Sequence, residues 1–222
     1  AVNPILWQKH GRIDLALHVL ADRAPAHRPL LLLHGLGERT IAGLPWPLSH
    51  FGGSVYGLDF TGHGLSTVAH GGGYTAEMLM ADAHVAAFAL SERHTLPPLV
   101  LGRGLGGYVG LLLAGADPTH VGGVVIADGP GLTGGGARPP SLYIGSDLRP
   151  SDETPDPFAL MELAGDVRPP DYAVMMINLA AAAQRPVPVA VSAKNRPEWL
   201  SAVVEQPGVR ELSIDVALGM LG

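Results

Sequence analysis

Hydrophobic positions along the chain change their period several times, and these changes separate predicted strands from predicted helices. Alternating apolar residues in 5–7 and 12–20 predict two strands joined by a turn at "KHG". Residues 28–37 form a continuous apolar run ending in glycines, which is typical of a strand buried on both faces of a parallel sheet. Residues 75–92 carry apolar side chains at helical spacing, and Thr75 is a suitable N-cap.

The alternation of strand and helix continues toward the end of the chain. Residues 96–115 predict an apolar strand, a glycine-rich turn and an apolar helix. Residues 53–67 and 120–131 each predict a strand that runs into a loop. Strands are also predicted at 187–193 and 209–215, and a helix opened by Pro197 at 196–206. This order predicts one α/β domain over 1–222, with a mostly parallel sheet and helices on both faces.

Residues 132–185 interrupt this pattern. Gly, Pro and Asp are frequent in its first part, which predicts loops. Two short helices are predicted within it, at 158–165 and 171–184. We expect the whole segment to be an insertion packed over one end of the sheet.

Composition narrows the classes of function. The chain is 47% hydrophobic and 15% charged with a formal net charge of −6, and it has no basic run, so nucleic acid and anionic membranes are not expected as main partners. The absence of cysteine excludes disulfides, thiolate catalysis and zinc–thiolate sites. No segment approaches the ~20 apolar residues of a membrane span, and the first residues lack the pattern of a signal peptide. A cytoplasmic location is expected.

Four motifs, in this order, resemble the α/β-hydrolase family. They are "LLLHGLG" at 31–37, "DFTGHGLS" at 59–66, "LVLGRGLGGYVGLLLAG" at 99–115 and "VGGVVIADGPG" at 121–131. The resemblance implies a central, mostly parallel eight-stranded sheet in which 132–185 is a reduced cap. It also implies a site at the carboxyl ends of the strands, where open α/β sheets bind their ligands.

The same resemblance identifies the positions of a catalytic triad. The nucleophile position, which is Ser in Gly-x-Ser-x-Gly, matches Gly104, and its neighbours Arg103 and Leu105 are not nucleophiles. The orienting acid would be Asn195, which has no carboxylate, or Asp128, whose alternative role is to cap its own loop.

The catalytic histidine would follow the last strand. The chain has no histidine after His120, so the base is either absent or lies beyond Gly222, and the short tail leaves no room for the family's last helix. Serine-hydrolase catalysis is therefore not expected.

The oxyanion hole depends on backbone groups and would survive the loss of side chains. By resemblance its donors are the N–H groups of Leu36 and Leu105, supported by the helix N-terminus and by Arg103. We expect a carboxylate or carbonyl group to bind there. The predicted ligand-binding residues are Leu36, Arg103, Gly104, Leu105 and Asp128.

These residues leave three hypotheses open. The first is a non-catalytic α/β-hydrolase-like protein that binds a small apolar or acyl ligand, or a protein partner, through the residual pocket. The second is an active esterase-like or lipase-like hydrolase without a serine nucleophile, using water activated by Asp128 or by a histidine. The third is a scaffold subunit with a closed pocket.

No cofactor is expected. "GRGLGG" has the wrong spacing for a dinucleotide site. His34, His63 and His84 lie on different predicted elements without a metal-binding spacing, so no metal site is expected either.

Overall fold

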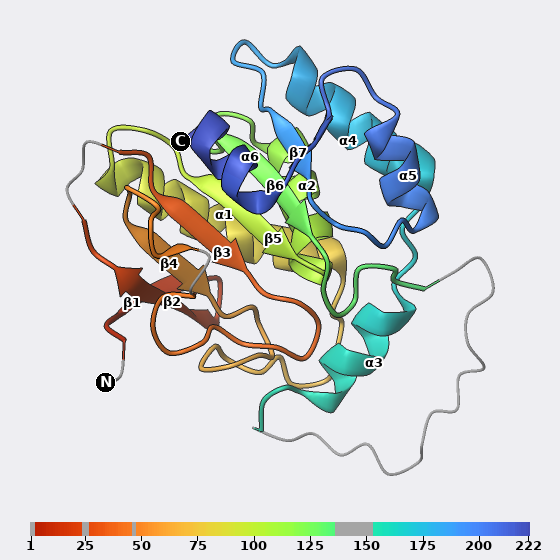
Figure 1. Ribbon diagram of the computed structural model, residues 1–222. Helices are drawn as coiled ribbons and strands as arrows, with labels where there is room; N and C mark the ends of the chain where they lie inside the picture. Colours follow the sequence, from red (N-terminus) through yellow and green to blue (C-terminus); the bar gives the residue numbers. More distant parts are fainter. Residues whose placement is uncertain (1–2, 24–26, 46–47, 136–152) are drawn as a thin grey trace.

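Eight strands form one sheet in the order β1-β2-β4-β3-β5-β6-β7-β8 (Figure 1). A computed structural model describes residues 3–23, 27–45, 48–135 and 153–222. β2 runs antiparallel to both β1 and β4, and all other pairs are parallel. The strands are β1 Ile5–His10, β2 Ile13–Ala21, β3 Leu30–Leu33, β4 Val55–Leu58, β5 Leu99–Arg103, β6 Gly123–Ala127, β7 Val189–Val191 and β8 Arg210–Glu211. The predicted α/β-hydrolase architecture is confirmed by this sheet.

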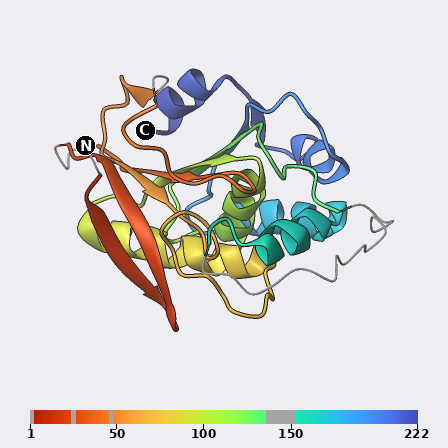
Figure 2. The same cartoon turned by 90° about the horizontal axis from the view of Figure 1, so that it is seen from below.

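The helices lie on both faces of the sheet and enclose two separate cores. They are α1 Ala76–Arg93, α2 Leu105–Ala116, α3 Pro157–Gly165, α4 Pro170–Ala182, α5 Glu198–Val204 and α6 Ile214–Leu221. The larger core packs α1, α2, α4 and α5 against one face, and α6 packs on the other (Figure 2). No helix in the described part of the chain is long and apolar enough to cross a membrane.

Capping and small residues explain how the helices of the larger core begin. The hydroxyl of Thr75 accepts a hydrogen bond from the Met78 nitrogen at 3.2 Å, which confirms the predicted N-cap of α1. At the start of α2, a Cβ on Gly106 would lie 2.3 Å from the Leu33 carbonyl oxygen. Glycine at this position is therefore what allows α2 to lie directly against β3.

The connection from β3 to β4 contains no α-helix in its described residues, 34–45 and 48–54. Its sequence, residues 34–54, includes five glycines and two prolines, which disfavour a continuous helix. The face of the sheet that carries α6 is therefore also covered by this loop, and strand side chains beneath the loop can line a cavity.

The end of the chain differs from the sequence prediction. The strand predicted at 209–215 is wrong in extent, because only Arg210–Glu211 pairs with β7. The expectation that the tail lacks the last helix is also wrong, since α6 occupies it. Ala217 and Leu218 pack α6 into the smaller core, and Ile214 and Leu221 lie at the spacing i, i+7 that completes its apolar face.

The segment 132–185, predicted as a cap, is divided by the structure. Residues 136–152 lie outside the described part of the chain. α4 packs against α2 and α5 and so belongs to the helical layer of the sandwich. α3 lies over the carboxyl end of the sheet, where Glu162 accepts hydrogen bonds from the nitrogens of Gly73 and Tyr74 at 2.8 and 2.7 Å.

Candidate functional site

The turn between β5 and α2 has the geometry of a strand–helix elbow. Gly104 forms it with φ 58° and ψ −120°, a conformation that glycine adopts without the strain other residues would carry. A Cβ at this position would lie 2.1 Å from the Pro130 carbonyl oxygen and 2.5 Å from the Gly129 carbonyl carbon. The backbone of the loop after β6 therefore fills the space that a side chain at position 104 would need.

The two N–H groups predicted as the oxyanion hole converge on one oxygen. The nitrogens of Leu36 and Leu105 lie 3.0 and 2.9 Å from the carbonyl oxygen of Pro130. Their common target is the arrangement that an oxyanion hole requires. The acceptor, however, belongs to the protein itself, so neither donor is free for a ligand, contrary to the open site expected from the sequence.

The loop that carries Pro130 is anchored after the proline. The carbonyl oxygen of Leu132 accepts a hydrogen bond from Trp199 Nε1 at 2.9 Å and a second one from the buried guanidinium of Arg168. Gly131 has φ 74°, and a Cβ there would lie 2.6 Å from the Leu36 Cβ. Glycine thus permits the loop to approach the elbow closely while its far end is held by buried donors.

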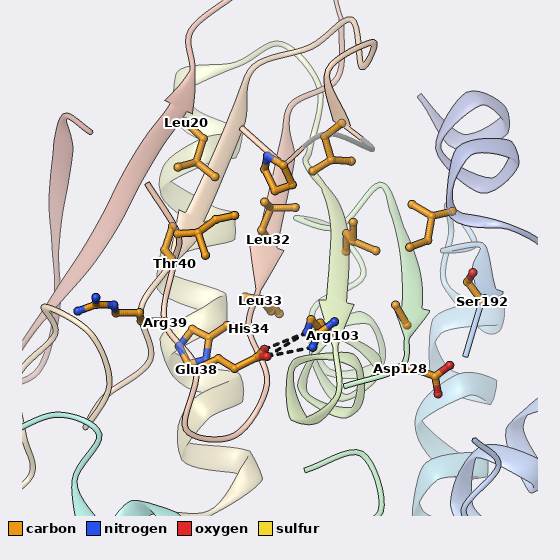
Figure 3. Close-up of a pocket in the computed structure, with 16 residues that line it drawn as sticks. Leu20, Leu32, Leu33, His34, Glu38, Arg39, Thr40, Arg103, Asp128 and Ser192 are labelled. Carbon is orange, nitrogen blue, oxygen red and sulfur yellow. Dashed lines mark hydrogen bonds and ion pairs between the residues drawn. The ribbon is translucent and has the colours of Figure 1, made fainter. Parts of the chain in front are cut away.

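Next to the elbow, Arg103 is engaged by an acidic side chain that the sequence did not single out. Its Nε lies 3.0 and 3.1 Å from the two carboxylate oxygens of Glu38, and Nη2 lies 3.0 Å from Oε1 (Figure 3). Glu38 Oε2 also accepts a hydrogen bond from the Gly35 nitrogen. Despite the opposing effect of partial burial, these donors lower the pKa of Glu38. Arg103 is therefore not directed at the oxyanion hole.

A cavity of about 700 Å³ lies beside this ion pair, on the face of the sheet that the β3–β4 loop covers. Leu20 and Leu32 line it from β2 and β3 (Figure 3). Leu101 from β5 and Ile214 from α6 complete its apolar wall. Its volume is within the range of small-molecule sites. Of the five predicted ligand-binding residues, Arg103 and Asp128 line this cavity, whereas Leu36, Gly104 and Leu105 are not among its lining residues.

With this geometry in place, comparison with known proteins identifies the family. Residues 24–140, more than half of the chain, match the family described as serine aminopeptidase, S33 (Hydrolase_4). The chain belongs to this family. The family fold agrees with the α/β-hydrolase resemblance of the four sequence motifs.

Solved structures with the same fold share little sequence with this member of the family. The thioesterase domain from the curacin biosynthetic pathway is 17% identical, with a TM-score of 0.65 over 100% of this chain and 98% of that one. A hydrolase from Pseudomonas aeruginosa is 22% identical, with a TM-score of 0.57 over 95% and 89%. N-formylmaleamic acid deformylase from Pseudomonas putida is 15% identical, with a TM-score of 0.60 over 96% and 92%. No curated protein matches the chain.

The two positions predicted for the orienting acid, Asp128 and Asn195, contact each other in this S33 family member. Asp128 accepts hydrogen bonds from the backbone nitrogens of Lys194 and Asn195 at 2.6 and 3.0 Å. Burial is slight and acts in the opposite direction, but these N–H groups lower the pKa of Asp128. A carboxyl group with a lowered pKa is a weak general base. Asp128 therefore holds the loop after β7, whereas the alternative predicted from the sequence had it cap its own loop.

The histidines near the elbow are neutral and fixed by backbone groups. His34 Nδ1 faces the Gly35 carbonyl oxygen at 2.8 Å, and Nε2 accepts a hydrogen bond from the Phe60 nitrogen at 3.2 Å. Burial, assisted by His63, lowers the pKa of His34 to about 4. Burial also lowers the pKa of His63, whose Nε2 accepts a hydrogen bond from the Gly37 nitrogen. Both nitrogens of each ring contact backbone groups of the surrounding loops, so neither ring has a nitrogen free to accept a proton.

The sequence analysis did not identify Pro130 and Glu38. Pro130 accepts the hydrogen bonds of Leu36 and Leu105, and Glu38 accepts those of Arg103. The signal for Pro130 was weak: "DGPG" shows a tight loop but not where its carbonyl points. Glu38 follows "LLLHGLG" directly, and only the sheet order, with β3 beside β5, brings it to Arg103. After β8, Leu212 and Ser213 lead directly into α6, in the place where the family pattern would have its histidine.

Proposed function

We propose that this protein is a non-catalytic member of its hydrolase family that binds a small apolar or acyl ligand. The observation that carries the proposal is the position of the Pro130 carbonyl, which accepts hydrogen bonds from both Leu36 and Leu105. A substrate carbonyl would have to displace it to be polarised, and Gly104 offers no oxygen for attack. Both requirements of acyl transfer by a serine hydrolase are therefore unmet.

The geometry also gives little support to a hydrolase without a serine nucleophile. Activation of water would need a base whose pKa lies near the operating pH. The pKa of Asp128 is lowered by its two backbone donors, and that of His34 is lowered by burial. No described feature of the site favours this second reading over ligand binding.

The cavity indicates the chemistry of the ligand. Its wall is mostly apolar, and three of its charged groups, Arg103, Glu38 and Asp128, lie near the carboxyl ends of the strands (Figure 3). An apolar body with few convergent polar groups is the usual composition of a small-molecule site. We infer that the ligand places its apolar or acyl part against Leu32 and Leu101 and its polar end toward Arg103.

The catalytic part of the proposal is tested by an activated fluorophosphonate probe and by turnover of short acyl esters. We expect no covalent labelling at any serine and no hydrolysis above the rate of buffer, while an active serine hydrolase run in parallel is labelled. Labelling of a serine would overturn the proposal. Ester turnover that disappears in Asp128→Ala would establish the second reading instead.

The binding part is tested by calorimetric titration with dodecanoate, a probe with an acyl chain and one charged end. We expect the wild type to bind it, and Leu101→Trp, which fills the cavity, to weaken binding more than about tenfold. Leu96→Trp is the control, since Leu96 is 41% exposed and does not line the cavity. Failure of the wild type to bind, or equal binding by both variants, would refute the cavity as the binding site for this class of ligand.

A further inference from the structure

Three side chains capable of binding a metal meet on the surface, away from the elbow. His84 Nε2 lies 2.8 Å from Asp117 Oδ2, and His120 Nδ1 lies 2.6 Å from the same oxygen. The three ligand atoms all lie within 4.8 Å of one another. His84 comes from α1, Asp117 caps the end of α2, and His120 lies in the turn before β6. The fold therefore gathers at one point residues that are separated by up to 36 positions in sequence.

Asp117 is held in a fixed orientation. Its backbone N–H donates to the Leu113 carbonyl oxygen at 2.8 Å as the C-cap of α2, and its Oδ1 accepts a hydrogen bond from the Thr119 nitrogen at 3.2 Å. The other oxygen, Oδ2, is the one directed at the two imidazoles. A ligating carboxylate whose second oxygen is bonded by a backbone donor is typical of a preorganised metal site.

An aromatic ring supports both imidazoles. Phe88 lies one turn after His84 on α1, with its ring centroid 5.1 Å from that of His120 and 6.5 Å from that of His84. This packing restricts the ring orientations from one side. His84 remains 46% exposed, so the opposite side is open to solvent.

We propose that His84, Asp117 and His120 form a binding site for one divalent transition-metal ion of the Zn²⁺, Co²⁺ or Ni²⁺ type. Two imidazole nitrogens with one carboxylate oxygen are the donors these ions accept, whereas Mg²⁺ and Ca²⁺ prefer oxygen alone. The ion would take the place of the ring protons that face Asp117, and solvent on the exposed side would supply the remaining ligand.

The distances suit such an ion after small side-chain rotations. In a tetrahedral zinc site, neighbouring ligand atoms lie roughly 3.4 Å apart, given bond lengths near 2.1 Å. The two contacts to Asp117 are slightly shorter than this, and no pair of the three atoms is farther apart than 4.8 Å. To admit the ion, the rings of His84 and His120 would rotate about their χ angles away from Asp117, toward the side not packed by Phe88.

This site is distinct from the apolar cavity and does not depend on the proposed function. Gly104 and Asp117 are the N-cap and C-cap of α2, whose 12 residues correspond to about 18 Å of helix. The ion would join α1 to the turn after α2. Its expected effect is stabilisation of the helical layer by binding to the folded state only.

The experiment is a calorimetric titration of the full chain with Zn²⁺ after treatment with EDTA and dialysis. We expect one Zn²⁺ per chain and a higher melting temperature with the ion than without it. His84→Ala, His120→Ala and Asp117→Asn should each weaken binding more than about tenfold. His10→Gln is the matched control, because His10 and Asp82 form a single His–Asp contact at 2.7 Å that no second histidine completes in the described residues.

Two results of the Zn²⁺ titration would overturn the proposal, and a third would come from Mg²⁺. One is the absence of binding at one ion per chain by the wild type. The other is equal Zn²⁺ affinity in the wild type and the three site variants. Mg²⁺ serves as the test of donor chemistry: Mg²⁺ binding as tight as that of Zn²⁺ would refute coordination by the two imidazoles.

Discussion

The carbonyl oxygen of Pro130 lies 2.9 Å from the backbone nitrogen of Leu105, the first residue of α2. The first N–H groups of a helix have no partner within the helix and need an external acceptor. In an open oxyanion hole that acceptor is water or substrate, but here it is a neutral peptide group of the same chain. The contact therefore completes the N-terminus of α2 as a structural unit, at the place where the family resemblance implies a reaction centre.

The first prediction concerns the space at the elbow. Gly104→Ala should destabilise the protein more than Gly11→Ala, measured as the free energy of unfolding in denaturant. Both glycines have similar positive φ angles, 58° and 60°, so alanine is disfavoured by the backbone at both positions. Only Gly104 faces a clash, with its Cβ 2.1 Å from the Pro130 oxygen, whereas Gly11 has no atom within 4 Å. The difference should be about 1–3 kcal/mol.

The comparison of Gly104→Ala with Gly11→Ala also tests whether the loop of Pro130 is fixed in the space beside Gly104. If the loop of Pro130 moved away readily, the two alanine variants would lose similar stability, and the loop would not be a fixed part of the site. Gly104→Ser is expected to be as destabilised as Gly104→Ala and to remain inactive on acyl esters. Ester turnover by Gly104→Ser would contradict the proposed loss of both the base and the open oxyanion hole.

The second prediction tests the anchor of this loop. Trp199→Phe removes the Nε1–H that donates to the buried Leu132 carbonyl oxygen at 2.9 Å. Because the carbonyl keeps Arg168 as a donor, the loss should be about 1–2 kcal/mol in the free energy of unfolding, and not the larger cost of an unpaired group. Part of it comes from the contact with Tyr108, whose ring centroid lies 4.9 Å from that of Trp199. Unchanged stability would mean that the loop does not depend on this bond.

Much of the fold could be predicted from the sequence because its signals are local. The continuous apolar run that contains β3, the glycine-rich turn at Gly104 and the N-cap at Thr75 each reflect the chemistry of neighbouring residues. α6 was missed because the strand predicted at 209–215 extended into its first two residues, and the seven residues that follow were too short a segment to indicate a helix. Its helical form depends on burial of Ala217 and Leu218 against the sheet, which is a tertiary effect.

The sequence could not predict which groups occupy the hydrogen-bond donors of the candidate site, because these contacts join segments that are far apart along the chain. The sequence placed Leu36 and Leu105 as paired donors, and they do share one acceptor, but the identity of that acceptor depends on the path of the loop after β6. Arg103 was expected to add positive charge beside the N–H groups of Leu36 and Leu105. It binds Glu38 instead, which lies in the loop after β3, the strand next to β5. Likewise, His84 has no spacing signal, because its partners Asp117 and His120 lie on the next helix and turn.

The third prediction concerns pH. The pKa of His34 is about 4 in the folded protein, mainly because of burial, against about 6.5 in the unfolded chain. Between these values the unfolded state binds the proton and the folded state does not, so stability falls as pH is lowered. From pH 7 to pH 5 this group alone should cost about 2 kcal/mol. His34→Gln should reduce the pH dependence of unfolding over this interval by a similar amount, and an unaltered dependence would exclude His34 as its source.

The last prediction concerns the ion pair between Arg103 and Glu38, which lines the cavity. A double-mutant cycle with Arg103→Met and Glu38→Gln should give a coupling energy of about 0.5–1 kcal/mol, decreasing when salt is raised. The pair is bidentate, but the Arg103 side chain is 57% exposed and that of Glu38 31%, so water screens most of their attraction. A weak pair can open to let Arg103 meet the polar end of a ligand. A coupling above about 2 kcal/mol that is insensitive to salt would indicate a desolvated, closed pair, and Arg103 would then be unavailable to a ligand.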